Sequence, residues 1–233
     1  MKKIIYFLFF ITIHGYSQSI KAIYTRTIMK SIGSIKESIS DFKPETYAYS
    51  YANKKSTYEL IPIQKSSLDT SYIEHDGHKF ETYKEITLPT TDITFKNLNN
   101  QLLQKEYTVS KKDFSAKEKL TDYEWTIQDE TTIINGYTCK KATTKKSLAP
   151  ITAWYCEEIP INDGPSVYWG LPGLILKVEL GEYTTIVLNK IKISKENIEI
   201  EEPKTKSTPL PIREFYKSIN DYLHSISSLT KYK

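Results

Sequence analysis

Two histidines and two carboxylates in one short run are the most evident potential metal ligands of this sequence. His75 and His78 stand in Glu74-His75-Asp76-Gly77-His78. Imidazole and carboxylate groups are ligands of zinc and copper. A site would need a third ligand from elsewhere, and Asp76-Gly77 also fits a solvent-exposed hairpin turn. We therefore expect no resident metal and no cofactor, and keep His75 and His78 as the metal candidates.

Cys139 and Cys156 are the two cysteines of the chain. In an antiparallel hairpin, the residue numbers of two opposed residues always add up to the same value. If Cys139 and Cys156 are opposed, the tip of the hairpin lies between Ser147 and Leu148. That tip lies in the polar segment 145–150, which has the composition of a loop. In an oxidising compartment an even number of cysteines favours a disulfide. We predict a cross-strand disulfide, with buried free thiols as the alternative.

Common sequence signatures of catalysis do not occur in the chain. It contains no Gly-x-Ser-x-Gly nucleophile elbow and no glycine-rich phosphate-binding loop. Adjacent carboxylates, as in Glu157-Glu158 and Glu201-Glu202, would point to opposite faces of a strand and could not act on one substrate atom. The sequence leaves enzymatic activity uncertain and favours a non-catalytic protein.

Residues 1–17 have the layout of a secretory signal peptide. Lys2 and Lys3 precede the apolar run 4–13, and Gly15 and Ser17 are small residues at the −3 and −1 positions of a cleavage site. The apolar run is shorter than the roughly 20 residues that a membrane-spanning helix needs. We expect cleavage after Ser17 and a periplasmic or secreted location.

The expected mature chain, residues 18–233, suits one domain with a substantial core. The formal charge of the full chain is +4, and two of its positive charges, Lys2 and Lys3, belong to the expected signal peptide. The remaining surface is close to neutral, which argues against a nucleic-acid partner. No later apolar run is long enough to span a membrane.

The composition favours β-strands, because tyrosine, threonine and isoleucine are plentiful and glycine is scarce. Tyr47, Tyr49 and Tyr51 alternate with small residues, which places the three rings on one face of a sheet. Residues 174–180 also alternate, with Leu174, Leu176, Val178 and Leu180 on one face.

Tight turns connect several of the expected strands. The segments 123–127 and 131–134 have strand composition, and Asn135-Gly136 after them is a strong two-residue turn signal. Gly181 fits the first central position of a second two-residue turn. Consecutive strands joined by short turns form an antiparallel meander.

The C-terminal region has a different pattern, because its apolar residues recur at helical spacing after Pro211. The pattern predicts an amphipathic helix over residues 211–228 that packs on the sheet. We therefore predict a mainly β fold, an antiparallel and strongly curved sheet of half-barrel or bowl shape with this helix against it. The apolar stripe consists of Ile212, Phe215, Tyr216, Ile219, Tyr222, Leu223 and Ile226.

An ordered set of short motifs resembles the GLPGLI family of exported envelope proteins from Gram-negative bacteria. Residues 170–175 read Gly-Leu-Pro-Gly-Leu-Ile, the hexapeptide that names the family. The family has no established activity, so the resemblance implies a location and a fold but no catalytic residues. Cys156 departs from the family pattern, and so does the hairpin tip 145–149. The other matching motifs are 123–125, 134–142, 153–155 and 158–161.

The hexapeptide has two physical interpretations. In the first, Pro172 and Gly173 occupy the central positions of a type II turn, between buried Leu171 and Leu174. In the second, its exposed backbone lines a ligand pocket beside two tryptophans. The candidate ligand-binding residues of the second interpretation are Trp154, Trp169, Gly170, Leu171, Pro172 and Gly173.

For function, we predict a non-catalytic binding protein that holds an apolar ligand on the concave face of the sheet. One alternative is a protein-interaction module serving an outer-membrane complex, and another is an enzyme of unknown class. A deep apolar cavity would favour the first. A flat apolar patch would favour the second, and titratable groups converging in a pocket would favour the third.

Overall fold

A computed structural model describes residues 18–29, 43–62, 68–75, 78–85, 89–146 and 149–229. Within 68–75, 78–85 and 227–229 the backbone alone is described. The expected signal peptide, residues 1–17, lies outside these ranges.

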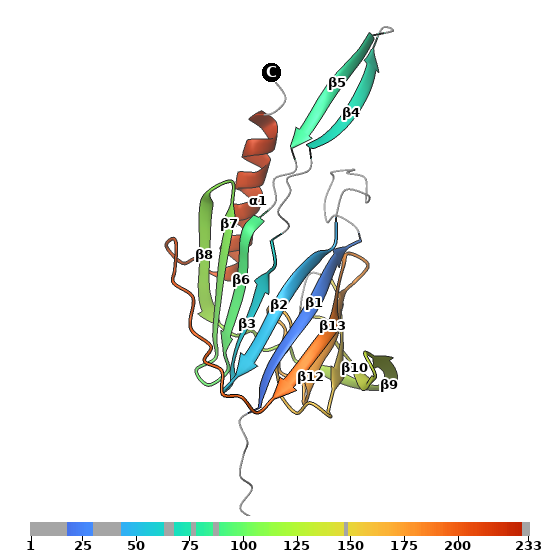
Figure 1. Cartoon of the computed structure of the whole chain (residues 1–233), viewed down its shortest axis with the longest axis vertical. Coiled ribbons are helices and arrows are strands. Elements are labelled where there is room, and N and C mark those ends of the chain that lie inside the picture. The colour runs from blue at the N-terminus through green and yellow to red at the C-terminus, as the bar shows by residue number, and fades with distance from the viewer. Residues whose placement is uncertain are drawn as a thin grey trace, which may run out of the picture.

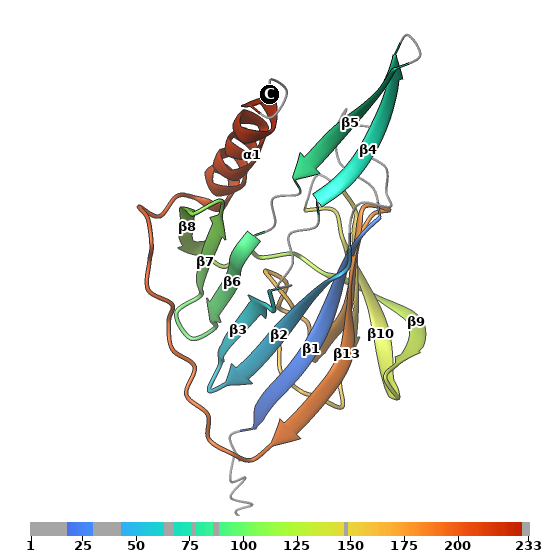
Figure 2. The same ribbon diagram turned by 45° about the horizontal axis from the view of Figure 1, so that its top comes forward.

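The main body is one open antiparallel sheet of eleven strands in the order β8-β7-β6-β3-β2-β1-β13-β12-β11-β10-β9. Figures 1 and 2 show that the sheet twists and curves along this order. The prediction of a mainly β, curved antiparallel fold is confirmed. The strands are β1 (Ser19–Ile28), β2 (Glu45–Ala52), β3 (Lys55–Leu60), β6 (Pro89–Asn97), β7 (Leu102–Val109), β8 (Lys112–Lys119), β9 (Thr126–Ile134), β10 (Tyr137–Thr144), β11 (Ile151–Cys156), β12 (Leu174–Leu180) and β13 (Thr184–Ser194).

In the middle of the sheet, the first strand of the chain pairs with the last one. Strand β1 pairs with β2 on one side and with β13 on the other, from Ser19↔Ser194 to Ile28↔Thr184. Two further strands, β4 (Leu68–His75) and β5 (His78–Glu85), form a separate hairpin between β3 and β6 in the sequence. This hairpin projects beyond the end of the sheet (Figure 1).

The turns confirm one of the sequence signals and correct another. Asn135 and Gly136 both have positive φ, at 51° and 83°, and connect Ile134 directly to Tyr137, as a type I′ turn does. Gly181 also has positive φ, but Leu180 pairs with Thr184, so this turn has three residues and not the predicted two.

The inner, concave face of the sheet is lined with tyrosines. Tyr47, Tyr49 and Tyr51 share this face, as predicted, and all three are buried. Tyr24 and Tyr58 lie on the neighbouring strands of the same face. The Tyr47 and Tyr58 rings stack with centroids 4.3 Å apart. Successive strands therefore build one continuous aromatic layer.

Helix α1 (Ile212–Leu229) confirms the predicted helix and covers one end of the sheet. Phe215 and Ile219 are buried against Val109, Phe114 and Ala116 of β7 and β8. Because their spacing puts Phe215 and Ile219 on one stripe, one face of the helix completes a small second core.

The chain also covers the outer edge of β8 just before the helix begins. The Leu210 N–H donates to the Ser115 carbonyl at 3.0 Å, and the Lys117 N–H donates to the Leu210 carbonyl at 3.2 Å. The Ile212 N–H at the helix start donates to Glu118 Oε2 at 2.9 Å. The edge strand β8 thus has partners on both sides.

None of the described residues belongs to a helix with the length and apolarity required to cross a membrane.

We expect Phe215→Ala to lower the free energy of unfolding by about 3 kcal/mol, because it leaves a cavity between α1 and the sheet. Urea unfolding followed by circular dichroism measures the change. Lys217→Ala, on the exposed side of the same helix, is the control and should change stability by less than about 0.5 kcal/mol. Equal effects of the two substitutions would show that the helix is not docked through Phe215.

Candidate functional site

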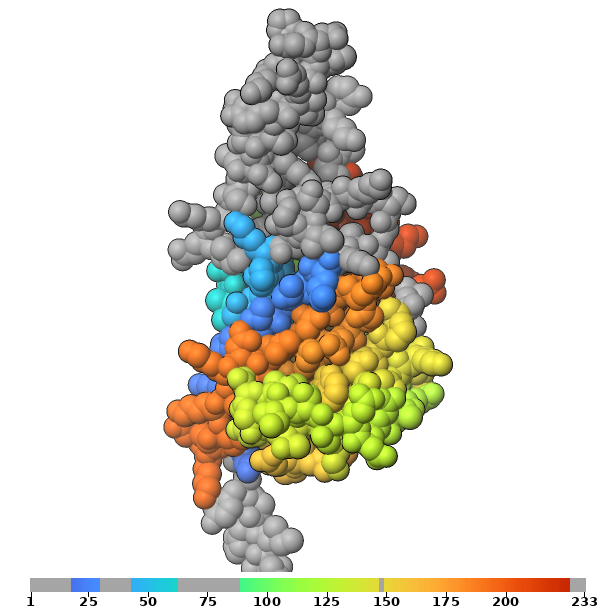
Figure 3. Space-filling view, turned by 90° about the vertical axis from the view of Figure 1, so that its right-hand side faces the viewer, coloured from blue at the N-terminus to red at the C-terminus, as the bar shows by residue number. Residues whose placement is uncertain are grey.

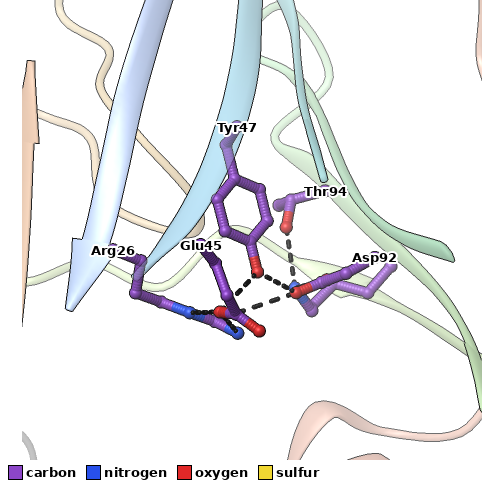
Figure 4. A network of polar contacts seen from close by, with 6 residues as sticks. Arg26, Glu45, Tyr47, Asp92 and Thr94 are labelled. Carbon is purple, nitrogen blue, oxygen red and sulfur yellow. Dashed lines mark hydrogen bonds and ion pairs between the residues drawn. The ribbon is translucent and has the colours of Figure 1, made fainter. Parts of the chain in front are cut away.

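A network of charged and polar side chains lies on the inner face, on β1 and β2 on one side of β3 and on β6 and β7 on the other. We call it the rim network, and Figure 4 shows most of its members pointing toward one another. Strands β1 and β2 supply three members, and β6 and β7 supply the other three. The members are Arg26, Glu45, Tyr47, Asp92, Thr94 and Lys105.

The contacts of the rim network pair every charge with an opposite one. Arg26 Nε donates to Glu45 Oε2 at 2.6 Å, and its guanidinium lies 5.0 Å from the centre of the Tyr47 ring. The Tyr47 hydroxyl donates to Asp92 Oδ2 at 2.9 Å. Lys105 Nζ lies 3.2 Å from Asp92 Oδ1. The network therefore connects β1, β2, β6 and β7 without a net charge.

The electrostatics of the rim network hold Asp92, Lys105 and Tyr47 in their ordinary protonation states at neutral pH. Burial opposes ionisation of Asp92, but Lys105 and Arg26 outweigh it and lower the pKa of that carboxyl. Burial opposes the charge of Lys105, but Asp92 outweighs it and raises the pKa of the ammonium. Burial and then Asp92 raise the pKa of Tyr47. Asp92, Lys105 and Tyr47 are therefore not poised to exchange a proton near pH 7.

A second ion pair is completely buried and holds the loop 157–173, which connects β11 to β12. Lys96 Nζ lies 2.6 Å from Asp163 Oδ1, and neither side chain is exposed to solvent. Lys96 Nζ also donates to the Gly164 and Tyr168 carbonyls, at 2.6 and 3.0 Å. Burial lowers the pKa of Lys96, and Asp163 offsets only part of this effect. Such a pair is stable only with its hydrogen bonds complete.

The loop 157–173 fills the concave face with the chain's own residues. The Tyr49 hydroxyl donates to Asp163 Oδ2 of the loop, and the Tyr24 hydroxyl donates to the carbonyl of Ile175 at the start of β12, both at 2.9 Å. Ile159 and Leu171 of the loop are buried in the main hydrophobic core. The loop therefore occupies the space in which an apolar ligand was predicted.

The hexapeptide, which joins the end of this loop to the start of β12, is a buried corner, but it does not contain the predicted turn. Gly170 has φ of +95°, whereas Gly173 does not have positive φ, so the type II turn prediction is wrong at Gly173. Glycine is needed there because a Cβ would lie 2.1 Å from the Cys156 carbonyl oxygen. Leu171 and Leu174 are buried on either side, as expected.

The two tryptophans predicted to flank a pocket have no contact partner in common among their described contacts. Trp169 Nε1 donates to the Thr121 carbonyl at 2.7 Å. Trp154 Nε1 lies 3.3 Å from Glu179 Oε2, and Lys141 lies over its ring. Each indole is held separately, so ligand binding by Trp154, Trp169 and residues 170–173 stays a prediction.

The two cysteines lie in the predicted hairpin register, without a bond between them. The pairs Lys140↔Tyr155 and Lys141↔Trp154 confirm the predicted hairpin register. Cys139 and Cys156 are buried and are not bonded to each other in this structure, so the disulfide stays a prediction. Each sulfur has backbone partners of its own: Cys139 Sγ lies 3.5 Å from the Tyr137 carbonyl, and the backbone after β11 hydrogen-bonds to Cys156. Burial raises the pKa of Cys139 to about 12, so this thiol is a poor nucleophile.

The candidate metal ligands His75 and His78 face each other as the last pair of the β4–β5 ladder. Their side chains lie outside the described part of the structure, so metal binding there stays untested. Among the residues whose side chains are described, no three or more histidine, cysteine, aspartate or glutamate residues gather as metal ligands.

Strand β9 forms the other end of the sheet, and we call it the β9 edge. It pairs with β10 alone. Ile127 and Ile133 of this strand are 54% and 74% exposed. Figure 3 shows the yellow-green β9–β10 region at the surface. The sequence predicted strands on both sides of residues 128–130, but it gave no signal that this hairpin ends the sheet.

A bulge divides the β9 edge. Lys140 of β10 pairs with Thr131 and Ala142 pairs with Ile127, so β9 has four residue steps where β10 has two. This explains why the sequence favours two short strands where the structure has one interrupted strand. Bulges are common on exposed sheet edges, where they limit pairing with other chains.

The best-formed surface pockets of the described residues lie away from the inner face. One, of about 560 Å³, is lined by Glu124, Thr126 and residues 143–146. The other, of about 500 Å³, lies between residues 100–102 and 117–119, beside Glu202. Both are shallow and mainly lined by polar or charged side chains, which does not suit an apolar ligand.

Comparisons with known proteins support the fold and leave the activity open. Residues 146–177 match a protein-family model described as "Protein of unknown function (Porph_ging)". Two structures of PNGF-II, in space groups C2 and P21, are similar to this chain with 14% and 15% identity and TM-scores of 0.52 and 0.51. The similarity covers 87% of this chain but only about a third of those chains, at 32% and 33%. No curated protein matches the sequence.

We expect Lys96→Met to lower the free energy of unfolding by about 3–5 kcal/mol, because it leaves a buried carboxylate without its cation. Urea unfolding measures the loss. The double variant Lys96→Met/Asp163→Leu should be more stable than Lys96→Met alone, since both charges are then removed.

The control for this ion pair is Lys117→Met, which breaks an exposed pair of the same 2.6 Å length with Glu202. It should change stability by no more than about 1 kcal/mol. A Lys96→Met variant as stable as Lys117→Met would contradict a structural role for the buried pair.

Stability should fall as the pH rises from 10 to 12. Burial raises the pKa of Tyr51 and Tyr168 to about 12, and that of Tyr24 and Tyr49 further. Phenols of the unfolded chain ionise near pH 10, so the stabilisation is complete below pH 10 and is lost above it. The loss is about 1.4 kcal/mol per pH unit for each buried tyrosine. Lys96 has a lowered pKa, so its own contribution to stability rises with pH. It is one group against several buried tyrosines.

Urea unfolding at pH 9 and pH 11 measures this effect, and absorbance at 295 nm follows the phenolates directly. Fewer of the 18 tyrosines should ionise at pH 11 in the native protein than in urea. Identical titration curves in the two conditions would show that the aromatic layer is open to solvent.

Proposed function

We propose that this chain is an exported, non-catalytic envelope protein that acts by binding another protein. The observation that carries the proposal is the β9 edge, a sheet edge with two exposed isoleucines and one neighbouring strand. Exposed strand edges and apolar side chains are surfaces to which protein partners add.

Two further observations support protein binding over the other candidate functions. The concave face, where we predicted an apolar ligand, contains the loop 157–173 and its buried Lys96–Asp163 pair. The titratable groups of the rim network converge, but the pKa values of Asp92 and Lys105 are shifted away from neutrality. A general acid or base needs a pKa near the working pH, so this network does not support an enzyme.

The family and location also belong to this proposal. The family-model match includes residues 170–175, but it is to the Porph_ging family of unknown function. Membership of the GLPGLI family stays our proposal and rests on the motifs of the sequence. We take residues 1–17 as a signal peptide and 18–233 as one domain, located in the periplasm or outside the cell. A component of an outer-membrane complex fits such a location as the partner. The similarity to PNGF-II concerns the fold and carries no activity to this chain.

Native mass spectrometry of the mature protein, purified gently from its own compartment, tests the proposal against a carrier function. We expect the mass of the bare chain, because the concave face is already filled. The same sample sprayed under denaturing conditions is the control for covalent additions. A reproducible small-molecule mass that is lost on denaturation would refute the proposal and support a carrier.

A further inference from the structure

Resting on the proposed function, we propose that the β9 edge binds an extended, basic segment of a partner protein. The segment adds to the sheet as a further strand beside Thr131–Ile134, and a lysine or arginine of the segment lies near Asp129. Four observations lead to this occupant.

The first observation is the difference between the two ends of the sheet. At β8, Leu210 makes backbone hydrogen bonds with Ser115 and Lys117 and so occupies the edge. At β9, the ladder to β10 satisfies one side of the strand only. Every second N–H and C=O of such a strand points away from the sheet. An added strand supplies the partners for these groups.

The second observation is the side-chain composition of the edge. Thr131, Thr132, Ile133 and Ile134 are all β-branched, a type that pairs well across strands. Ile133 is the most exposed large apolar side chain described, at 74%. A partner strand would remove part of this surface from water, which is favourable for association.

The third observation is the bulge, which limits where a strand can add. The regular ladder of β9 runs from Thr131 to Ile134, and the register shifts between Thr131 and Ile127. A flat partner strand can therefore pair with Thr131–Ile134 only, and not with the residues beyond the bulge. Beyond it, the exposed residues Asp129 and Glu130 come next to the partner.

The fourth observation is the charge of this region. Residues 120–134 contain four acidic residues and no lysine or arginine, although the whole chain has a net charge of +4. Glu124 and Glu130 form ion pairs with Lys146 and Lys141. A second copy of the chain would bring two acidic edges together, whereas a basic segment complements them. The occupant is therefore a basic segment and not a second copy.

The probe is a labelled synthetic peptide of about eight residues, with alternating threonine and valine and a lysine at each end. The matched peptide carries glutamate in place of lysine. Fluorescence anisotropy at low salt measures the affinity of both peptides for the full mature chain. Amide hydrogen exchange identifies the protected residues. We expect the lysine peptide to bind more tightly and to protect amides within Thr131–Ile134.

Asp129→Lys should weaken binding of the lysine peptide on the order of three- to tenfold and strengthen binding of the glutamate peptide, because one surface charge is reversed. Glu59→Lys makes the same change at an exposed position of β3, away from the sheet edge, and should leave both affinities unchanged. Equal melting temperatures of the two variants would exclude a folding defect as the cause.

Three results would overturn the inference: no protection at Thr131–Ile134, equal effects of Asp129→Lys and Glu59→Lys, or concentration-dependent dimerisation that protects the same amides. With a bare chain in native mass spectrometry, such results reject this docking mode and leave the proposed function standing. A retained small molecule rejects the proposed function whatever the peptides do.

Discussion

The buried pair of Lys96 and Asp163 is the constraint on which the arrangement of the inner face depends. Two charges removed from water must be paired and fully hydrogen-bonded, or the fold loses several kcal/mol. Here the ammonium contacts one carboxylate and two carbonyl oxygens, and the carboxylate also accepts the Tyr49 hydroxyl. These contacts fix the loop 157–173 against β2 and β6. With the loop held there, Gly173 lies against the backbone of Cys156, and Leu171 and Leu174 are buried.

The rim network extends this principle to the more accessible part of the inner face. Arg26, Glu45, Asp92 and Lys105 compensate one another, and Tyr47 connects them to the main hydrophobic core, of which its ring is a part. A half-barrel of this kind offers space for a ligand, but in this chain its own loop and charges occupy that space. The exposed isoleucines Ile127 and Ile133 lie instead at the margin of the sheet, on β9.

Local features of the fold could be predicted from the sequence, because each depends on residues close together in the chain. The alternation of Tyr47, Tyr49 and Tyr51, the Asn135-Gly136 turn, the hairpin register around Cys139 and Cys156, and the helix after Pro211 are of this kind. The strand order could not be predicted, since β1 pairs with a strand from the far end of the chain. Lys96 carries no signal of burial either, because its partner Asp163 is distant in sequence. The turn predicted at Gly173 failed for the same reason, since the contact that requires glycine there comes from β11.

The pairing of β1 with β13 has a consequence for the time at which the protein can fold. The Ser19 and Ser194 hydroxyls that meet at 2.9 Å across this ladder are separated by 175 residues. A ribosome has therefore synthesised most of the chain before the central strand can acquire its second neighbour. Folding rates fall as contacts become less local, so assembly of this sheet is expected to be slow and to follow synthesis. During that interval the tyrosine-rich strands are uncovered, which is the period when such a chain depends most on chaperones.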